Sequence, residues 1–324
     1  MLQRLRLRWI TWVLIVVAIG LGVVWYTPSL FVPAVTRLAR LAMGIDAREV
    51  VVDGRTWGYL ESGPAEAPPV LLLHGFGTSR EAMMSLMPWL APTHRCLAPD
   101  LPGFGRHPYH AGSVHDADFY VRQIVAFADA LGLRTFDVVG TSMGGALATH
   151  LAVQHPDRVR RLVLLAPAGV RAPVLNAFMQ QVERGANPLD IASEADFERV
   201  LGYVFEVPPP VPWQFRQFMT AEAVRRRPDT LQIVEAIRPF LLDGVRDELP
   251  KVQAPTLVVW GDRDRVTDRS MMPVFTAGIP RATGALIRGA GHVVFSDAPE
   301  ETRRSVVPFL QASEPTSAST DGVP

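Results

Sequence analysis

Strand-length apolar runs alternate with helical patterns along most of this chain. Residues 50–52 and 56–60 flank the dipeptide Asp53-Gly54, which predicts a β-hairpin. The uninterrupted apolar run at 70–73 is typical of a strand buried on both faces of a sheet. Further strand-like runs lie at 95–98, 136–139, 161–165, 256–260 and around 285–287, and further helical patterns lie at 116–131 and 299–310.

The alternation breaks over residues 172–250, which contain no clear strand pattern. Several helices are expected there, with breaks at Gly185, Pro188, 208–210, Pro228 and Pro239. The strand pattern resumes only after this segment. The chain is therefore predicted to be an α/β protein whose parallel sheet carries a helical insertion late in its strand order.

Composition narrows the possible functions. With 324 residues, of which 48% are hydrophobic, the chain is long enough for a substantial core. Its formal net charge is zero, so no nucleic-acid partner is expected. The single cysteine, Cys96, excludes an intramolecular disulfide. The sequence has neither metal-ligand spacing nor a glycine-rich phosphate loop, so we expect no metal and no cofactor.

The N-terminal segment has the pattern of a membrane anchor. Arg4, Arg6 and Arg8 precede an uncharged and mostly apolar run at 9–26, which is long enough to cross a bilayer as a helix. Because these basic residues precede the span, the globular domain is expected on the non-cytoplasmic side. The alternative is a cleaved signal peptide, although the residues after Tyr26 make a poor cleavage site.

The segment after the anchor is open to two interpretations. Arg37 and Arg40 interrupt an apolar stretch, so it is either a linker packed on the domain or a helix lying on the membrane surface. The end of the chain is rich in Ser, Thr and Pro, which is typical of disorder. The predicted organisation is thus an anchor or signal sequence at 1–27, a linker or interfacial segment at 28–48, an α/β core at 49–171 and 251–311, a helical insertion at 172–250, and a disordered tail at 312–324.

A serine stands at the apex of a strand–turn–helix pattern. The motif G-x-S-x-G at 140–144 follows a predicted strand and precedes a helical pattern. A side chain at Gly140 or Gly144 would clash with the neighbouring strand or helix, so the glycines allow a tight turn. The turn presents the Ser142 hydroxyl at the edge of the sheet, and Ser142 is the predicted nucleophile.

A serine hydroxyl becomes a good nucleophile only when a base takes its proton. His292 follows the last predicted strand, which places it at the same carboxyl edge as Ser142. An acid must hold the tautomer of the imidazole, and Asp264 follows the preceding strand. Asp264 is the predicted partner of His292, with Asp262 second and Asp268 third.

The oxyanion that forms on attack needs two preorganised N–H donors. The backbone N–H of Met143, directly after the nucleophile, is one predicted donor. The other is the backbone N–H of Phe76, in the loop at 74–77 after a predicted strand. His74 in the same loop is expected to have a structural role.

Together these motifs resemble the α/β-hydrolase family from about Glu49 to Leu310. The resemblance implies a mostly parallel eight-stranded sheet, with a helical lid after the sixth strand that corresponds to 172–250. The N-terminal span, the stretch at 52–55 and the stretch at 166–169 look most like membrane-anchored monoacylglycerol lipases and their bacterial relatives.

This narrower resemblance implies hydrolysis of a lipid-like carboxylic ester through an acyl-enzyme. The aromatic residues of the lid that we expect to line an acyl-chain channel are Phe178, Phe205, Trp213 and Phe218, although such residues also form the core of a lid. One alternative is a C–C bond hydrolase with the same triad, which would need an arginine for a carboxylate. Another is a catalytically silent binding protein, which would usually lack a member of the triad.

Overall fold

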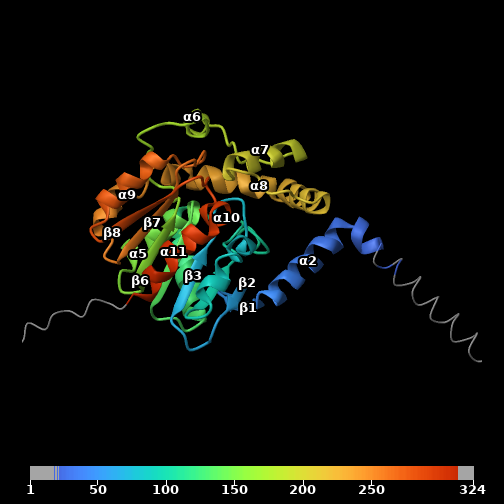
Figure 1. The fold of residues 1–324 in the computed structure, drawn as a ribbon, viewed down its shortest axis with the longest axis horizontal. Coiled ribbons are helices and arrows are strands. Elements are labelled where there is room, and N and C mark those ends of the chain that lie inside the picture. The colour runs from blue at the N-terminus through green and yellow to red at the C-terminus, as the bar shows by residue number, and fades with distance from the viewer. Residues whose placement is uncertain (1–17, 19, 21, 313–324) are drawn as a thin grey trace, which may run out of the picture.

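The computed structural model describes residues 18, 20 and 22–312, and a mostly parallel sheet forms its centre (Figure 1). The eight strands lie in the order β1-β2-β4-β3-β5-β6-β7-β8. β2 pairs antiparallel with β1 and β4, and all other neighbours are parallel. The strands are β1 Asp46–Val52, β2 Arg55–Ser62, β3 Pro69–Leu73, β4 Arg95–Pro99, β5 Phe136–Thr141, β6 Val159–Leu165, β7 Thr256–Gly261 and β8 Ala282–Ile287. The predicted hairpin is confirmed as β1 and β2.

Helices cover both faces of the sheet. Side chains of α4 and α5 belong to the core on one face, and side chains of α3 and α11 belong to the core on the other. The helices are α2 Pro28–Ala42, α3 Met87–Leu90, α4 Ala117–Ala130, α5 Met143–Gln154, α6 Ala177–Glu183, α7 Glu194–Val204, α8 Trp213–Asp243, α9 Met272–Gly278, α10 Val294–Asp297 and α11 Pro299–Gln311, with short 3-10 turns at Arg80–Met83, Arg246–Lys251 and Arg269–Met271.

The continuous apolar run of β3 is explained by these two cores. Leu71 and Leu73 pack into the core on the α4 and α5 face, and Val70 and Leu72 pack into the core on the other face. Successive side chains of a strand point to opposite faces, so a strand covered on both sides needs apolar residues throughout. The sheet is thereby fixed as a rigid platform for the loops at its carboxyl edge.

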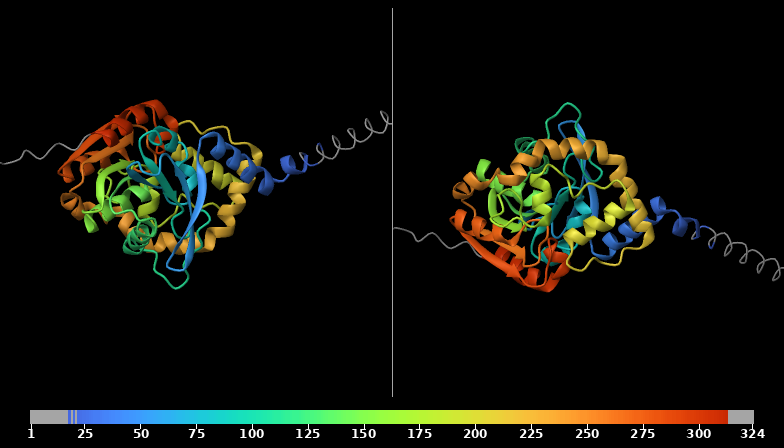
Figure 2. Two further views of the ribbon diagram at one scale, coloured as in Figure 1. Left: turned by 90° about the horizontal axis from the view of Figure 1, so that it is seen from below. Right: turned by 90° about the horizontal axis from the view of Figure 1, so that it is seen from above.

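The segment between β6 and β7 contains α6, α7 and α8, which lie together at one end of the sheet (Figure 1). α6 ends before Gly185 and α7 ends before 208–210, as predicted. The expected breaks at Pro228 and Pro239 are wrong, because α8 runs through both prolines as one 31-residue helix. It curves instead (Figure 2), as helices do where a proline removes a backbone donor. Burial of Ile233 and Ile237 on α8 stabilises the helix despite this loss.

α2 lies beside α8 in both views of Figure 2. Phe31 of α2 packs edge-on against Phe215 of α8, with ring centroids 6.2 Å apart. Leu38 and Leu41, elsewhere on α2, are exposed. Most of the anchor predicted at 1–27, and nearly all of the tail predicted at 312–324, lie outside the described residues. No described helix combines the length and the apolar character that a membrane crossing requires.

Candidate active site

Ser142 occupies a strained turn between β5 and α5. Its backbone has φ 53° and ψ −118°, a conformation that is costly for a residue with a side chain. The Ser142 N–H donates to the carbonyl of Leu165 on β6 at 3.0 Å, which ties the turn to the neighbouring strand. A Cβ at Gly140 would lie 2.3 Å from the Gly144 carbonyl oxygen, and a Cβ at Gly144 would lie 2.3 Å from the Leu73 carbonyl oxygen. Both glycines are therefore required by close backbone approach, as the sequence predicted.

His292 and Asp264 form a buried pair. Nδ1 of His292 lies 2.9 Å from Oδ2 of Asp264, and the side chain of Asp264 is fully buried. The other oxygen of Asp264 accepts the backbone N–H groups of Val266 at 2.8 Å and Thr267 at 3.1 Å. These backbone donors hold the carboxylate in one orientation. The imidazole then donates from Nδ1, which leaves the lone pair on Nε2 free to accept a proton.

Thr267 is a further member of this group that the sequence reasoning missed. Its hydroxyl lies 2.8 Å from Oδ2 of Asp264 and 3.2 Å from Nδ1 of His292. Its hydroxyl thus contacts both the carboxylate and the imidazole and fixes their positions relative to each other. No sequence motif marks Thr267, since only the curl of the chain after β7 brings its hydroxyl back to Asp264.

The other two acids that the sequence left open lie elsewhere. Asp262 accepts the backbone N–H of Gly289 at 2.7 Å, and Asp268 accepts that of Ser270 at 2.8 Å. Each of these carboxylates therefore stabilises a turn. Among the three candidates, the geometry brings only Asp264 to the imidazole of His292.

The loop between β3 and the first 3-10 turn approaches the serine closely. A Cβ at Gly75 would lie 3.3 Å from Cβ of Ser142. The backbone N–H groups of Phe76 and Met143 have no acceptor in the part of the chain that is described. Met143 also begins α5, and the N-terminus of a helix favours negative charge. These N–H groups are thus available to an oxyanion.

His74 connects this loop to Leu101 through hydrogen bonds. It is fully buried, Nδ1 donates to the Gly75 carbonyl at 2.8 Å, and Nε2 accepts the Leu101 N–H at 3.0 Å. Burial lowers the pKa of His74, so the ring stays neutral around pH 7. Its hydrogen bonds are those of a structural residue.

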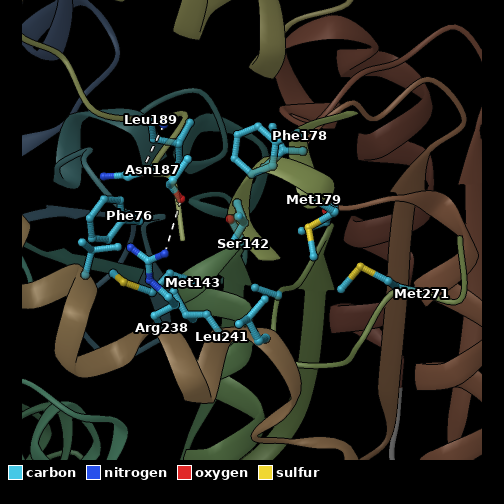
Figure 3. Close-up of a pocket in the computed structure, with 17 residues that line it drawn as sticks. Phe76, Ser142, Met143, Phe178, Met179, Asn187, Leu189, Arg238, Leu241 and Met271 are labelled. Atoms are coloured by element: carbon cyan, nitrogen blue, oxygen red, sulfur yellow. Dashed lines mark hydrogen bonds between the residues drawn. The ribbon is translucent and has the colours of Figure 1, made fainter. Parts of the chain in front are cut away.

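A pocket opens beside Ser142 under the helical segment (Figure 3). It holds about 690 Å³ of empty space, part of it open to solvent, and its walls are largely apolar. Thr267 lines it with Ser142, so the His292 and Asp264 pair lies next to the serine's pocket. Among the described residues, Ser142 and His292 are not joined by a hydrogen bond. Such bonds often tighten only when substrate is bound.

The aromatic residues predicted for the lid differ in where they lie. Phe178 lines the pocket, whereas Phe205, Trp213 and Phe218 are not among its lining residues. Trp213 instead packs near Tyr26, with ring centroids 6.5 Å apart. The first turns of α8 face α2 rather than the serine, which the sequence pattern alone did not reveal.

The pocket also contains polar residues that the sequence reasoning did not select. Arg238 of α8 and Asn187 of the loop between α6 and α7 line it together with the apolar residues. Arg238 is the only charged residue among those lining this pocket. The one signal in the sequence was position, because Arg238 follows Val234 and precedes Leu241 at helical spacing, and both of these also line the pocket.

A family model described as the alpha/beta hydrolase fold matches residues 68–299. Monoacylglycerol lipase abhd6-B of Xenopus laevis is 27% identical over 298 residues, covering 86% of each chain. Lipase 1 of Psychrobacter immobilis is 28% identical over 260 residues, covering 79% of this chain and 81% of the relative. The crystal structure of a bacterial membrane phospholipase A matches with a TM-score of 0.85 and 32% identity, over 94% of this chain and 98% of that one.

Proposed function

The chain belongs to the alpha/beta hydrolase family, and from this premise we propose that it is a serine hydrolase of lipid-like carboxylic esters. The observation that carries the proposal is a strained serine beside a buried histidine–aspartate pair, at the wall of a largely apolar pocket. Its relatives are named as lipases that act on monoacylglycerol or phospholipid. An apolar pocket of this size suits an acyl chain.

The acylation step uses the three predicted catalytic residues. Nε2 of His292 takes the proton of the Ser142 hydroxyl as Oγ attacks the ester carbonyl. The oxyanion that develops accepts the backbone N–H groups of Phe76 and Met143. Asp264 stabilises the imidazolium through the contact at Nδ1. His292 then gives the proton to the departing alcohol, and the acyl group remains on Ser142.

Deacylation repeats these roles with water. His292 takes a proton from water, which attacks the acyl-enzyme, and the same two N–H groups hold the second oxyanion. The proton returns to Oγ of Ser142, and the fatty acid leaves. The buried position of Asp264 keeps its charge away from solvent, so it stabilises the imidazolium more strongly than a surface carboxylate would.

Substitution of the serine tests this proposal. Ser142→Ala should abolish turnover of p-nitrophenyl butyrate, because no other described side chain takes its place at the turn. A thermal melt that matches the wild-type protein would show that the variant is folded. Turnover at the wild-type rate in a folded Ser142→Ala variant would refute the assignment.

A C–C bond hydrolase is the second candidate, and one observation favours it. Such an enzyme would use the same triad with an arginine for the carboxylate of its substrate, and Arg238 lines this pocket. The remaining walls are largely apolar, which favours the ester. Loss of the visible absorbance of a vinylogous diketone substrate, without turnover of any ester, would select the C–C hydrolase.

Membrane attachment forms the second part of the proposal. Residues 1–27 anchor the protein as a single span, with the hydrolase domain on the non-cytoplasmic side. Support comes from α2, whose exposed residues include Leu30, Leu38 and Leu41, as expected for a segment near a bilayer. An N-terminal tag should remain on the mature protein, and a C-terminal tag should be cut by protease added to the outer side. Loss of the N-terminal tag would instead indicate a cleaved signal peptide.

A further inference from the structure

Two side chains that line the pocket carry buried hydrogen-bond donors that no described group accepts. The side-chain oxygen of Asn187 accepts the Leu189 N–H at 3.2 Å, which fixes the orientation of the amide. The amide nitrogen, Nδ2, is buried and has no partner among the described residues. The same holds for Nε of Arg238. Buried donors without acceptors are rare, so such groups call for an explanation.

The charge of Arg238 is balanced only by a carboxylate at the protein surface. One of its terminal nitrogens donates to Glu235 at 3.0 Å, but the side chain of Glu235 is 73% exposed. Water screens a carboxylate in that position. Another nitrogen reaches the Ala186 carbonyl at 3.4 Å, a long contact. A positive group therefore faces a largely apolar pocket, where its field is weakly screened.

The position of these donors relative to the serine is shown in Figure 3. Ser142 lies between two groups of lining residues in that view. Arg238 and Asn187 lie to its left together with Phe76 and Leu189, and Phe178, Met179 and Met271 lie to its right. An ester whose carbonyl is at Ser142 would thus extend toward an apolar group on one side and toward the wall that contains Arg238 and Asn187 on the other.

We propose that Arg238 and Asn187 form a subsite for an oxyanion, a phosphate or a carboxylate, carried by the alcohol part of the ester. This inference rests on the proposed function. The free atoms of the subsite are donors, and an oxyanion is purely an acceptor, whereas a glycerol hydroxyl also needs an acceptor for its own proton. The subsite therefore makes the enzyme selective for anionic monoesters over neutral ones.

Kinetics with matched short-chain esters test the subsite without effects from micelles. The probes are 1-hexanoylglycerol, 1-hexanoylglycerol 3-phosphate and the hexanoyl ester of glyceric acid. The measured quantity is the ratio of kcat/KM for each anionic probe to kcat/KM for the neutral one. Arg238→Gln should lower this ratio by about 10- to 100-fold, the effect of losing charge-assisted hydrogen bonds. Whichever anionic probe has the higher ratio in the wild-type enzyme identifies phosphate or carboxylate as the preferred group.

Further variants separate recognition from simple disruption. Asn187→Asp keeps the oxygen that accepts the Leu189 N–H but replaces the free donor with a negative group, so it should lower the same ratio. Arg238→Lys should restore part of the selectivity, because it keeps the charge but loses the planar fork. Arg225→Gln is the control, since Arg225 lies on the same helix, is exposed and pairs with Glu222. Its ratio should stay within about twofold of wild type.

The outcomes distinguish the subsite from the enzyme. If wild type hydrolyses the neutral probe but Arg238→Gln and Asn187→Asp leave the ratio unchanged, the subsite is refuted and the hydrolase stands. If wild type hydrolyses none of the esters, the proposed function itself fails and the subsite fails with it. A selective fall of the ratio in both variants, with the Arg225→Gln control unchanged, supports the subsite.

Discussion

Replacement of Asp264 by asparagine should almost eliminate turnover while leaving the fold intact. The backbone N–H groups of Val266 and Thr267 donate to Oδ1, at 2.8 and 3.1 Å, so they will hold the new amide oxygen in that place. The amide NH₂ then takes the place of Oδ2, 2.9 Å from Nδ1 of His292. An NH₂ group cannot accept a hydrogen bond, so His292 must present its Nδ1 lone pair and carry its proton on Nε2.

A histidine with its proton on Nε2 cannot take the proton of Ser142. We therefore expect kcat to fall by about 10⁴-fold, as when the wrong tautomer is imposed on a catalytic triad. This corresponds to about 5 kcal/mol of lost transition-state stabilisation. The assay is hydrolysis of p-nitrophenyl butyrate by variants whose thermal melts show a folded protein.

The matched control is Asp262→Asn. Asp262 lies two residues earlier and accepts the Gly289 N–H at 2.7 Å, away from the imidazole. An asparagine can keep that hydrogen bond through its amide oxygen, so we expect a change of at most about threefold in kcat. Equal losses in the two variants, or a larger loss at Asp262, would refute the reasoning.

Three further predictions concern the turn, the pH dependence and the pocket. Gly144→Ala should lower the free energy of unfolding by at least ~2 kcal/mol, because its Cβ would lie 2.3 Å from a backbone oxygen. The control is Gly202→Ala, which should not lower it, because nothing lies within 4 Å of a Cβ at that position. Urea unfolding measures the free energy of unfolding of both variants. Burial lowers the pKa of His107 to about 4. Between about pH 4 and 6.5 the His107 imidazole therefore binds a proton only in the unfolded chain. For this group, the free energy of unfolding should fall with decreasing pH by up to about 1.4 kcal/mol per pH unit. His107→Phe should reduce that slope in urea unfolding at several pH values without abolishing it, because burial also lowers the pKa of His115 to about 4. An unchanged slope would exclude His107 as one of its sources. Phe178→Ala should reduce kcat/KM about tenfold more for decanoyl than for butanoyl p-nitrophenyl esters, and equal losses would place the acyl chain elsewhere.

The parts of the fold that could be predicted from sequence are those set by local pattern. The hairpin followed from Asp53-Gly54 between two apolar runs, and β3 followed from an apolar run that serves two cores. The course of α8 did not follow, because Pro228 and Pro239 predict breaks locally. Burial of Ile233 and Ile237 on the same helix outweighs that preference.

The candidate site likewise contains some residues that could be predicted from the sequence and others that could not. Ser142 and His292 could be selected because a glycine-bounded turn and a loop after the last strand are local features. Thr267 could not, because its role depends on the side chains it meets in space. The pocket lining shows the same limit, since helical spacing does not reveal whether Trp213 faces the serine or α2.

The central claim is that the hydroxyl of Ser142 is activated by the buried pair behind it. A fluorophosphonate that reacts with the folded protein tests this directly when the adduct is mapped by peptide mass spectrometry. We predict one adduct, on Ser142, which forms far more slowly in Asp264→Asn. A folded wild-type protein that acquires no adduct, or acquires it on a different residue, would contradict the account.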